Sequence, residues 1–262
     1  MDTLQAVLLG IVQGITEFLP VSSSGHLQIA KELLGVELDN NITFDVTLHA
    51  ATVLSTIVVM HREIARLVAG LFARPLNDAQ RYILKILLSM IPAGIVGIAL
   101  GDRIEALFGS LAFVGAMLLL TAALLAFAYR ARPRPKAEIT YRDAFLIGLA
   151  QAAATLPGLS RSGSTIAAGL LLGDSKESTA RFSFLMVIPV ILGKMLLDIG
   201  SGEMAALTVP TPALVGGFLA AFTVGALACR FMIEVVKRGK LIWFAAYCAL
   251  AGLVSIATAL IR

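Results

Sequence analysis

Residues 16–26 read Thr-Glu-Phe-Leu-Pro-Val-Ser-Ser-Ser-Gly-His and bring an acid, three serines, a proline, a glycine and a histidine into one short stretch. Apolar sequence flanks it at 4–15 and 27–34. Residues 155–165 read Thr-Leu-Pro-Gly-Leu-Ser-Arg-Ser-Gly-Ser-Thr and also lie within apolar sequence. We call 16–26 the first polar segment and 155–165 the second. Polar segments inside apolar sequence restrict how the rest of the chain can be arranged, because they need polar or buried surroundings.

The composition is that of an integral membrane protein. The chain has 262 residues, of which 58% are hydrophobic and 15% are charged, and its mean hydropathy is +0.89. Soluble domains carry about 25% charged residues. Runs of about 20 apolar residues, each long enough to cross a hydrocarbon core of about 30 Å, recur along the sequence. We therefore predict one all-α, polytopic membrane domain over residues 1–262. The two cysteines lie in apolar helical sequence, where packing is their expected role.

Positive charges mark alternate loops. Most of the 21 lysines and arginines fall in four stretches, at 60–86, 128–144, 174–181 and 230–240. The intervening connections and the C-terminus hold only Lys31, Arg103 and Arg262. The positive-inside rule then places the four basic stretches in the cytoplasm and both termini outside. Topology thus explains the net charge of +4, and no nucleic-acid partner is needed.

The charge map requires two hairpins that do not cross the membrane. Residues 4–34 must enter from outside and return there, and residues 144–172 must enter from the cytoplasm and return there. The apolar runs after the polar segments, 27–34 and 166–172, are too short to span. Such broken segments are typical of re-entrant helices. We expect about six spanning helices and two re-entrant hairpins of opposite orientation.

Identities at a fixed offset of 138 residues indicate a duplication. They pair Gly10 with Gly148, Gln13 with Gln151, Ser22 with Ser160, Ser24 with Ser162, and Gly25 with Gly163. With the opposite orientations, they predict an inverted-topology repeat of about 1–129 and about 142–262, joined by a cytoplasmic linker at 130–141. Such repeats place a site near the membrane midplane, where the N-termini of half-helices face an anionic group.

The polar segments have the chemistry of a phosphate site. Pro20 and Pro157 end the preceding helices, because proline lacks the N–H donor. The serines that follow are good N-caps, and Gly25 and Gly163 leave backbone N–H groups open to a ligand. A helix N-terminus attracts phosphate. Arg161 adds a guanidinium that grips phosphate oxygens as a fork, so the two segments together would hold a diphosphate.

Structural explanations exist for several of these residues. Glu17 could form only an ion pair with Arg161, and His26 could be only a helix-capping residue. Gln13 lies one turn before Glu17 on the same helix face, where packing explains it as well as ligand contact does. Ionisable residues within the membrane are functional by default, however, and here they cluster with hydroxyls.

Residues 17–26 and 156–165 resemble the two signature motifs of the bacitracin-resistance family, the undecaprenyl-diphosphate phosphatases of the bacterial cell envelope. The resemblance covers essentially the whole chain. It implies a multi-pass hydrolase of the plasma membrane that converts undecaprenyl diphosphate to the monophosphate and inorganic phosphate. The site would open to the outer face, and the reaction would recycle the carrier lipid for peptidoglycan synthesis and confer bacitracin resistance.

The resemblance also implies dependence on a divalent cation, Mg²⁺ or Ca²⁺, for which Glu17 is the candidate ligand. The family motif has Glu or Gln four residues before its key glutamate, and here these positions are Gln13 and Glu17. The glutamine removes one carboxylate, which puts in doubt any mechanism that needs two acids there.

Four residues form the predicted catalytic group. We predict Ser23 as the nucleophile, His26 as its base and later as the acid, Glu17 to orient His26 or hold the cation, and Arg161 to bind phosphate oxygens. The competing mechanism keeps the serines as binding groups and has His26 or Glu17 activate water. The predicted substrate-binding residues are Gln13, Ser22, Ser24, Gly25, Ser160, Ser162, Gly163 and Thr165.

Two other classes of protein share some of these sequence features. Inverted repeats with broken helices are typical of transporters, so a flippase of undecaprenyl phosphate is the alternative hypothesis. The type-2 phosphatidate phosphatases also use Ser-Gly-His and Ser-Arg elements, but the His and Asp that their motif requires do not follow Arg161 here. The expected partners are the membrane and a long-chain prenyl diphosphate lipid. The sequence leaves open whether the protein forms a homodimer.

Overall fold

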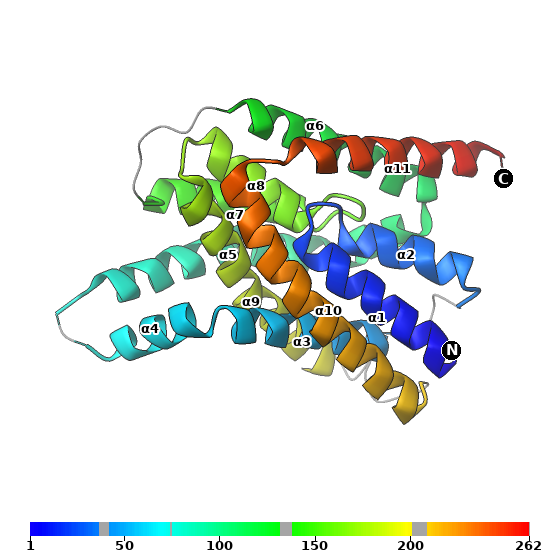
Figure 1. Ribbon diagram of the computed structural model, residues 1–262, viewed down its shortest axis with the longest axis horizontal. Coiled ribbons are helices and arrows are strands. Elements are labelled where there is room, and N and C mark those ends of the chain that lie inside the picture. Colours follow the sequence, from blue (N-terminus) through cyan, green and yellow to red (C-terminus); the bar gives the residue numbers. More distant parts are fainter. Residues whose placement is uncertain (37–41, 74, 132–137, 201–208, 262) are drawn as a thin grey trace.

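A computed structural model describes residues 1–36, 42–73, 75–131, 138–200 and 209–261, and none of these residues lies in a strand. The helices are drawn in Figure 1. Their bounds are α1 Thr3–Phe18, α2 Ser23–Leu33, α3 Ile42–Val59, α4 His61–Leu71, α5 Asp78–Glu105, the short 3-10 helix η1 Ala106–Gly109, α6 Leu111–Arg130, α7 Tyr141–Ala153, α8 Arg161–Leu171, α9 Lys176–Gly200, α10 Thr211–Arg238 and α11 Ile242–Ile261.

Five helices are long and apolar enough to cross a membrane, namely α5, α6, α9, α10 and α11. The pair α3 and α4 is bent by 81° and makes a sixth span if it is counted as one. The sequence prediction of an all-α, multi-pass membrane protein with about six spans is therefore confirmed.

Four helices of the hairpins are shorter than a span. Helices α1 and α2 have 16 and 11 residues, and α7 and α8 have 13 and 11. At about 1.5 Å per residue, 11 residues cover about 16 Å, roughly half of a hydrocarbon core. Each of these helices is therefore much shorter than α5 or α10, which have 28 residues each.

Helices α1 and α7 begin with the same capping device. The Asp2 side chain accepts a hydrogen bond from the backbone N–H of Gln5, and the Gln5 side chain accepts one from the Asp2 backbone. Thr140 and Asp143 form the equivalent reciprocal pair at the start of α7. Both capping boxes satisfy N–H groups that a helix start leaves free, so they fix where each hairpin begins.

The hairpins pack through small residues. Helix α1 lies along α10, where Gly10 faces the backbone carbonyl of Gly217 (Figure 1). Helix α7 packs on α5, where Gly148 faces the backbone carbonyl of Ser89. A side chain at either glycine would collide with that carbonyl. Small residues at membrane helix interfaces permit such close backbone approach, which gives the hairpins a fixed position.

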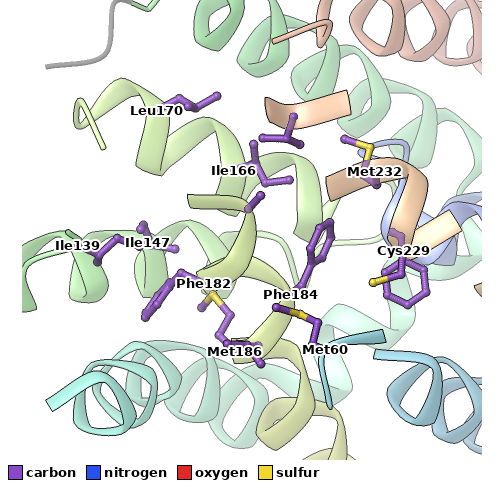
Figure 2. Packing of buried hydrophobic residues seen from close by; sticks show 14 of the residues in the cluster. Met60, Ile139, Ile147, Ile166, Leu170, Phe182, Phe184, Met186, Cys229 and Met232 are labelled. Carbon is purple, nitrogen blue, oxygen red and sulfur yellow. The ribbon is translucent and has the colours of Figure 1, made fainter. Parts of the chain in front are cut away.

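The largest hydrophobic cluster packs the second hairpin, α7–α8, against its neighbouring helices. It joins α7, α8, α9 and α10 through fully buried residues such as Ile166, Phe182 and Met232 (Figure 2). The Phe18 ring at the end of α1 meets Phe184 of α9 edge-on at 6.0 Å. Cys229 and Cys248 are buried and free, which confirms the packing role predicted for them.

Charged residues tie α4, α9 and α10 together at one end of the bundle. Arg181 pairs with Glu63 at 3.1 Å and with Glu177 at 3.0 Å, and Lys237 reaches Glu177 at 3.3 Å. These residues belong to the basic stretches that the charge map assigns to the cytoplasm. Residues 132–137, half of the predicted linker at 130–141, lie outside the described residues.

Candidate active site

The first polar segment forms a break between α1 and α2. Pro20 lies in the break, where it cannot continue the helix because it has no N–H to donate. Ser22 caps α2, and its Oγ accepts a hydrogen bond from the backbone N–H of Gly25 at 3.4 Å. Ser22 is the one non-glycine residue with a positive φ, 72°, in the described part of the chain. The break carries Glu17 on its α1 side and Ser23 on its α2 side.

The second polar segment forms the equivalent break between α7 and α8. Ser160 caps α8, and its Oγ accepts from the backbone N–H of Gly163 at 3.0 Å. Gly158 has a φ of 93° and lies against the backbone carbonyl of Val114 on α6, a position that only glycine can take without strain. Thr121 of α6 accepts a hydrogen bond from the Ser160 N–H at 3.0 Å. Helix α6 thus holds this break in place.

The two breaks touch each other. The Ser162 hydroxyl donates to the carbonyl oxygen of Leu19 at 3.0 Å. A Cβ added to Gly163 would lie 3.3 Å from Cβ of Pro20, and one added to Gly25 would lie 3.4 Å from Cα of Gly158. The polar segments therefore meet, as the sequence predicts, and bring the N-termini of α2 and α8 together.

Glu17 and Arg161 form the centre of the contact. One oxygen of Glu17 pairs with Nη2 of Arg161, and the other accepts hydrogen bonds from Ser23 Oγ at 2.7 Å and from Gln13 Nε2 at 3.0 Å. Glu17 is only 7% exposed. The charged carboxylate is kept in this buried place because three donors and one positive charge surround it.

Arg161 keeps one free donor. Its Nη1 is buried and has no hydrogen-bond partner among the described residues, and the same holds for Oε1 of Gln13. An unsatisfied buried polar group costs about 1–3 kcal/mol, and more when it is charged. A phosphate oxygen would supply the missing partner of Nη1. The guanidinium is therefore half paired within the protein and half available to an anion.

The remaining serines of the predicted binding set form a matched pattern. Ser22 Oγ lies 3.3 Å from Ser24 Oγ, and Ser160 Oγ lies 3.3 Å from Ser162 Oγ. Thr165 faces elsewhere, because its hydroxyl donates to the Arg161 carbonyl at 2.9 Å and also bonds Ser183 of α9 at 2.6 Å. In the structure Thr165 supports the first turn of α8.

His26 is not paired with Ser23, so the predicted base–nucleophile contact is corrected. Nδ1 of His26 bonds the carbonyl oxygen of Ser22 at 2.8 Å, and Nε2 bonds the Tyr247 hydroxyl at 2.7 Å. The structure records no bond between His26 and Glu17 either. The ring turns back over the start of its own helix, where the Ser22 carbonyl is the nearest acceptor. Ser23 has Glu17 as its partner instead.

Three residues near the site were not in the predicted set. Thr121 supports Ser160, and Tyr247 contacts His26 from α11, far away in the sequence. His49 of α3 is half-buried and close enough to Glu17 for an electrostatic interaction. His49 lies outside both polar segments, so neither motif points to it. None of the three lies in a motif that would have singled it out.

The described residues include no cluster of three or more His, Cys, Asp or Glu side chains that could hold a metal ion. Glu17 is the one carboxylate at the centre, and both of its oxygens already accept hydrogen bonds. Mg²⁺ commonly binds through one or two carboxylates plus substrate phosphates. The described residues therefore offer a cation one carboxylate at most, and they do not form a metal site that the protein completes alone.

Together, the fold and the site define a multi-pass membrane protein in which two helix breaks meet around a Glu17–Arg161 ion pair. Residues 6–254 match the family described as bacitracin resistance protein BacA, and the chain belongs to this family. The undecaprenyl-diphosphatase of Bacteroides fragilis is 57% identical over 260 residues, which cover 98% of each chain. That of Parabacteroides distasonis is 56% identical over 266 residues and all of both chains. That of Methanococcus vannielii is 41% identical over 255 residues, 95% of this chain and 98% of the relative.

Proposed function

We propose that this protein is an undecaprenyl-diphosphatase, a membrane hydrolase that releases inorganic phosphate from undecaprenyl diphosphate and leaves the lipid monophosphate. The observation that carries this proposal is the half-buried Arg161, whose buried Nη1 is free and lies beside the Glu17–Ser23 pair where two helix N-termini meet. The names of the relatives and the identity over whole chains support the same substrate. They do not favour the flippase alternative. Recycling of the carrier lipid and bacitracin resistance follow from this activity.

The geometry supports Ser23 as the nucleophile and Glu17 as the group that receives its proton. Ser23 Oγ already donates to Glu17 at 2.7 Å, the distance of a charge-assisted hydrogen bond. In the proposed step Ser23 Oγ bonds the terminal phosphorus, its proton passes to Glu17, and the bond from that phosphorus to the bridging oxygen breaks. Undecaprenyl phosphate leaves, and water then hydrolyses the phosphoserine. This revises the earlier assignment, in which His26 was the base.

Binding of the transferred phosphoryl group falls to the second break. Arg161 Nη1 and the backbone N–H groups at the starts of α2 and α8 offer donors to the equatorial oxygens. The N–H groups of Gly25 and Gly163 themselves donate to the Ser22 and Ser160 hydroxyls, and the missing side chain at both glycines leaves room for an anion to approach the helix starts. Phosphoryl transfer depends chiefly on positioning and on neutralising the oxygens, which is what this arrangement offers.

A divalent cation, Mg²⁺ or Ca²⁺, is part of the proposal. It would bind the diphosphate oxygens with Glu17 as its protein ligand, and when bound it would neutralise charge on the phosphates. The other members of the predicted binding set, from Gln13 to Ser162, would surround the same anion. Whether the protein works as a homodimer is left to experiment.

The placement in the membrane is also proposed. Residues 1–129 and 142–262 would form the inverted repeat, with hairpins α1–α2 and α7–α8 re-entrant from opposite sides of the bacterial inner membrane and the site open to the outer face. Three observations support this. The hairpin helices are too short to span, α2 and α8 have bounds that differ by the repeat offset, and α1–α10 packing matches α7–α5 packing.

The test of function is phosphate release by the purified protein from a long-chain prenyl diphosphate in lipid vesicles. We expect release by the wild type and none by Ser23→Ala. Ser255→Ala is the control, because Ser255 is also a helical serine but its hydroxyl bonds only its own helix α11. Substantial turnover by Ser23→Ala would exclude the covalent route and favour attack by water. No release by the wild type under any cation condition would refute the proposed function.

A further inference from the structure

The two breaks share a cap but differ in backbone strain. Ser22 and Ser160 occupy equivalent positions, and each accepts a hydrogen bond from the glycine three residues later. Ser160 has ordinary dihedral angles, φ −67° and ψ 119°. Ser22 has φ 72° and ψ 99°, a region that side-chain-bearing residues rarely adopt. Such a conformation persists only when its surroundings hold it, so something must hold Ser22.

His26 supplies part of that restraint. The Ser22 carbonyl oxygen accepts two hydrogen bonds from this one residue, from the backbone N–H at 3.2 Å and from ring Nδ1 at 2.8 Å. At the second break Ser164 stands in the place of His26. Its backbone N–H bonds the Ser160 carbonyl at 2.8 Å, but its buried hydroxyl has no partner among the described residues. The bond from a side chain to the cap carbonyl thus occurs at the strained break only.

Tyr247 holds the histidine ring from its other side. A carbonyl oxygen can only accept, so Nδ1 of His26 carries the proton and the neutral ring offers Nε2 as an acceptor. The Tyr247 hydroxyl donates to Nε2 at 2.7 Å, and the two rings stack at 5.5 Å with an angle of 20°. The neighbouring Cys248 thiol lies 3.5 Å from the Pro20 carbonyl oxygen. Helix α11, which runs past the first hairpin in Figure 1, therefore fixes this break at two consecutive residues.

We infer that Tyr247 is a positioning residue for the proposed reaction. Tyr247 fixes the His26 ring by hydrogen bonding and stacking, and His26 in turn clamps the carbonyl of Ser22 by its two hydrogen bonds. The strained Ser22 then sets the first turn of α2 so that Ser23 points at Glu17. Tyr247 touches neither the nucleophile nor the acid, so it acts only through His26. The reaction that it serves rests on the proposed function, whereas the clamp itself does not.

Kinetics test the inference with Tyr247→Phe, which removes the hydroxyl and keeps the ring. We expect kcat to fall about five- to tenfold with KM nearly unchanged, as for loss of one positioning hydrogen bond. The matched control is Tyr129→Phe on α6, a tyrosine of similar exposure whose hydroxyl makes no hydrogen bond within the described residues. That variant should keep wild-type kcat.

A double-mutant cycle separates positioning from general packing. Glycine adopts a positive φ readily, so in a Ser22→Gly background the clamp is no longer needed. Adding Tyr247→Phe there should lower kcat by less than about twofold. The effect of Tyr247→Phe would then depend on the residue at position 22, which is the coupling that residues of one network show and independent residues do not. Independent, multiplicative effects of the two substitutions, or wild-type kcat in Tyr247→Phe, would overturn the inference.

Nitrogen NMR provides a readout that needs no activity. In a His49→Gln, His61→Gln protein, His26 is the one remaining histidine of the three in the sequence. We expect its ring to be the Nδ1–H tautomer and its Nε2 resonance to shift in Tyr247→Phe. A ring in the Nε2–H tautomer, or a resonance that does not respond to Tyr247→Phe, would overturn the clamp even if phosphate release were never observed. Absence of phosphate release with an intact tautomer signature would instead refute the proposed function alone.

Discussion

Replacing Glu17 by glutamine should remove catalysis while keeping the shape of the site. Glutamine has the size of glutamate, but it cannot take up the Ser23 proton. Its amide nitrogen must also face at least one of the groups that now donate hydrogen bonds to the carboxylate. Assistance by a general base raises the reaction rate by about 10²- to 10⁴-fold. We therefore expect kcat to fall by about a thousandfold, which corresponds to about 4 kcal/mol of transition-state free energy.

The same substitution should lower stability, because it leaves Arg161 without its counter-charge. Removing one partner of a buried ion pair costs about 3–5 kcal/mol. The side chains of Arg161 and Glu17 are 18% and 6% exposed, so we expect the free energy of unfolding to fall by about 3 kcal/mol, at the lower end of that range. An anion bound to the freed guanidinium would restore part of the loss by mass action. Added inorganic phosphate should therefore raise the melting temperature of the variant more than that of the wild type.

The assay pairs phosphate release with thermal unfolding in the same detergent or vesicle preparation. Glu177→Gln is the matched control, because Glu177 also pairs with an arginine but has an exposed side chain. Exposed pairs contribute about 0–1 kcal/mol, so this control should keep its activity and nearly all of its stability. If Glu17→Gln kept more than about a tenth of wild-type kcat, Glu17 would not be the proton acceptor. If phosphate stabilised neither the wild type nor the variant, the free donor of Arg161 would not be the anion site.

Two further predictions concern the scaffold. Ser22→Gly should stabilise the fold by about 0.5–1 kcal/mol in thermal unfolding, because relief of the strained positive φ outweighs the few tenths of a kcal/mol lost with the cap. Ser160→Gly should destabilise the fold in the same measurement, because Ser160 has an unstrained φ and only the cap is lost. The opposite order would show that Ser22 is not strained. Gly148→Ala should cost about 1–3 kcal/mol by overpacking against the α5 backbone, whereas Gly94→Ala, with open space around it, should be neutral or better. Equal melting temperatures for these two would contradict the close α5–α7 contact.

Apolar runs located the long helices, whereas the serine caps located the starts of the short ones. The apolar runs are 27–34 and 166–172, but α2 begins at Ser23 and α8 at Arg161, directly after the capping serines. The reason is that a half-helix that binds an anion has a polar first turn, which reads as loop when only hydrophobicity is counted. Serine caps followed by glycine mark the true starts, because the cap oxygen accepts the N–H three residues later.

Helix α4 is the clearest element that the sequence analysis did not expect. Residues His61–Leu71 contain Arg62, Glu63 and Arg66 among apolar residues, a pattern that was interpreted as a basic cytoplasmic loop. In the structure these residues form an amphipathic helix bent by 81° from α3. The charged face pairs with α9 through Glu63 and Arg181, a contact between residues more than a hundred positions apart. The density of charged residues at 60–86 could indicate the side of the membrane, but it could not indicate that Glu63 pairs with Arg181.

The site was predictable to the extent that it repeats within the chain. Motif chemistry and the offset of 138 located Glu17, Ser23 and Arg161, and the structure brings all three together. The partner of His26 was not predictable, because Tyr247 lies 221 positions away in a plain apolar helix. An imidazole near a serine suggests a base, but the ring bonds the nearest carbonyl when that carbonyl belongs to a strained cap.

The two breaks differ at the positions that matter most to the proposed reaction. Both offer a helix N-terminus that attracts an anion, but only the differences between them can divide binding from attack. At equivalent positions the first break has Ser23 where the second has Arg161, and Glu17 where the second has Thr155. Because the breaks face each other, Glu17 meets Arg161 and Ser23 at once, and the pair consumes only one of the two guanidinium η-nitrogens. In the proposed reaction the second break therefore holds the phosphoryl group through Arg161, while Ser23 of the first break attacks it.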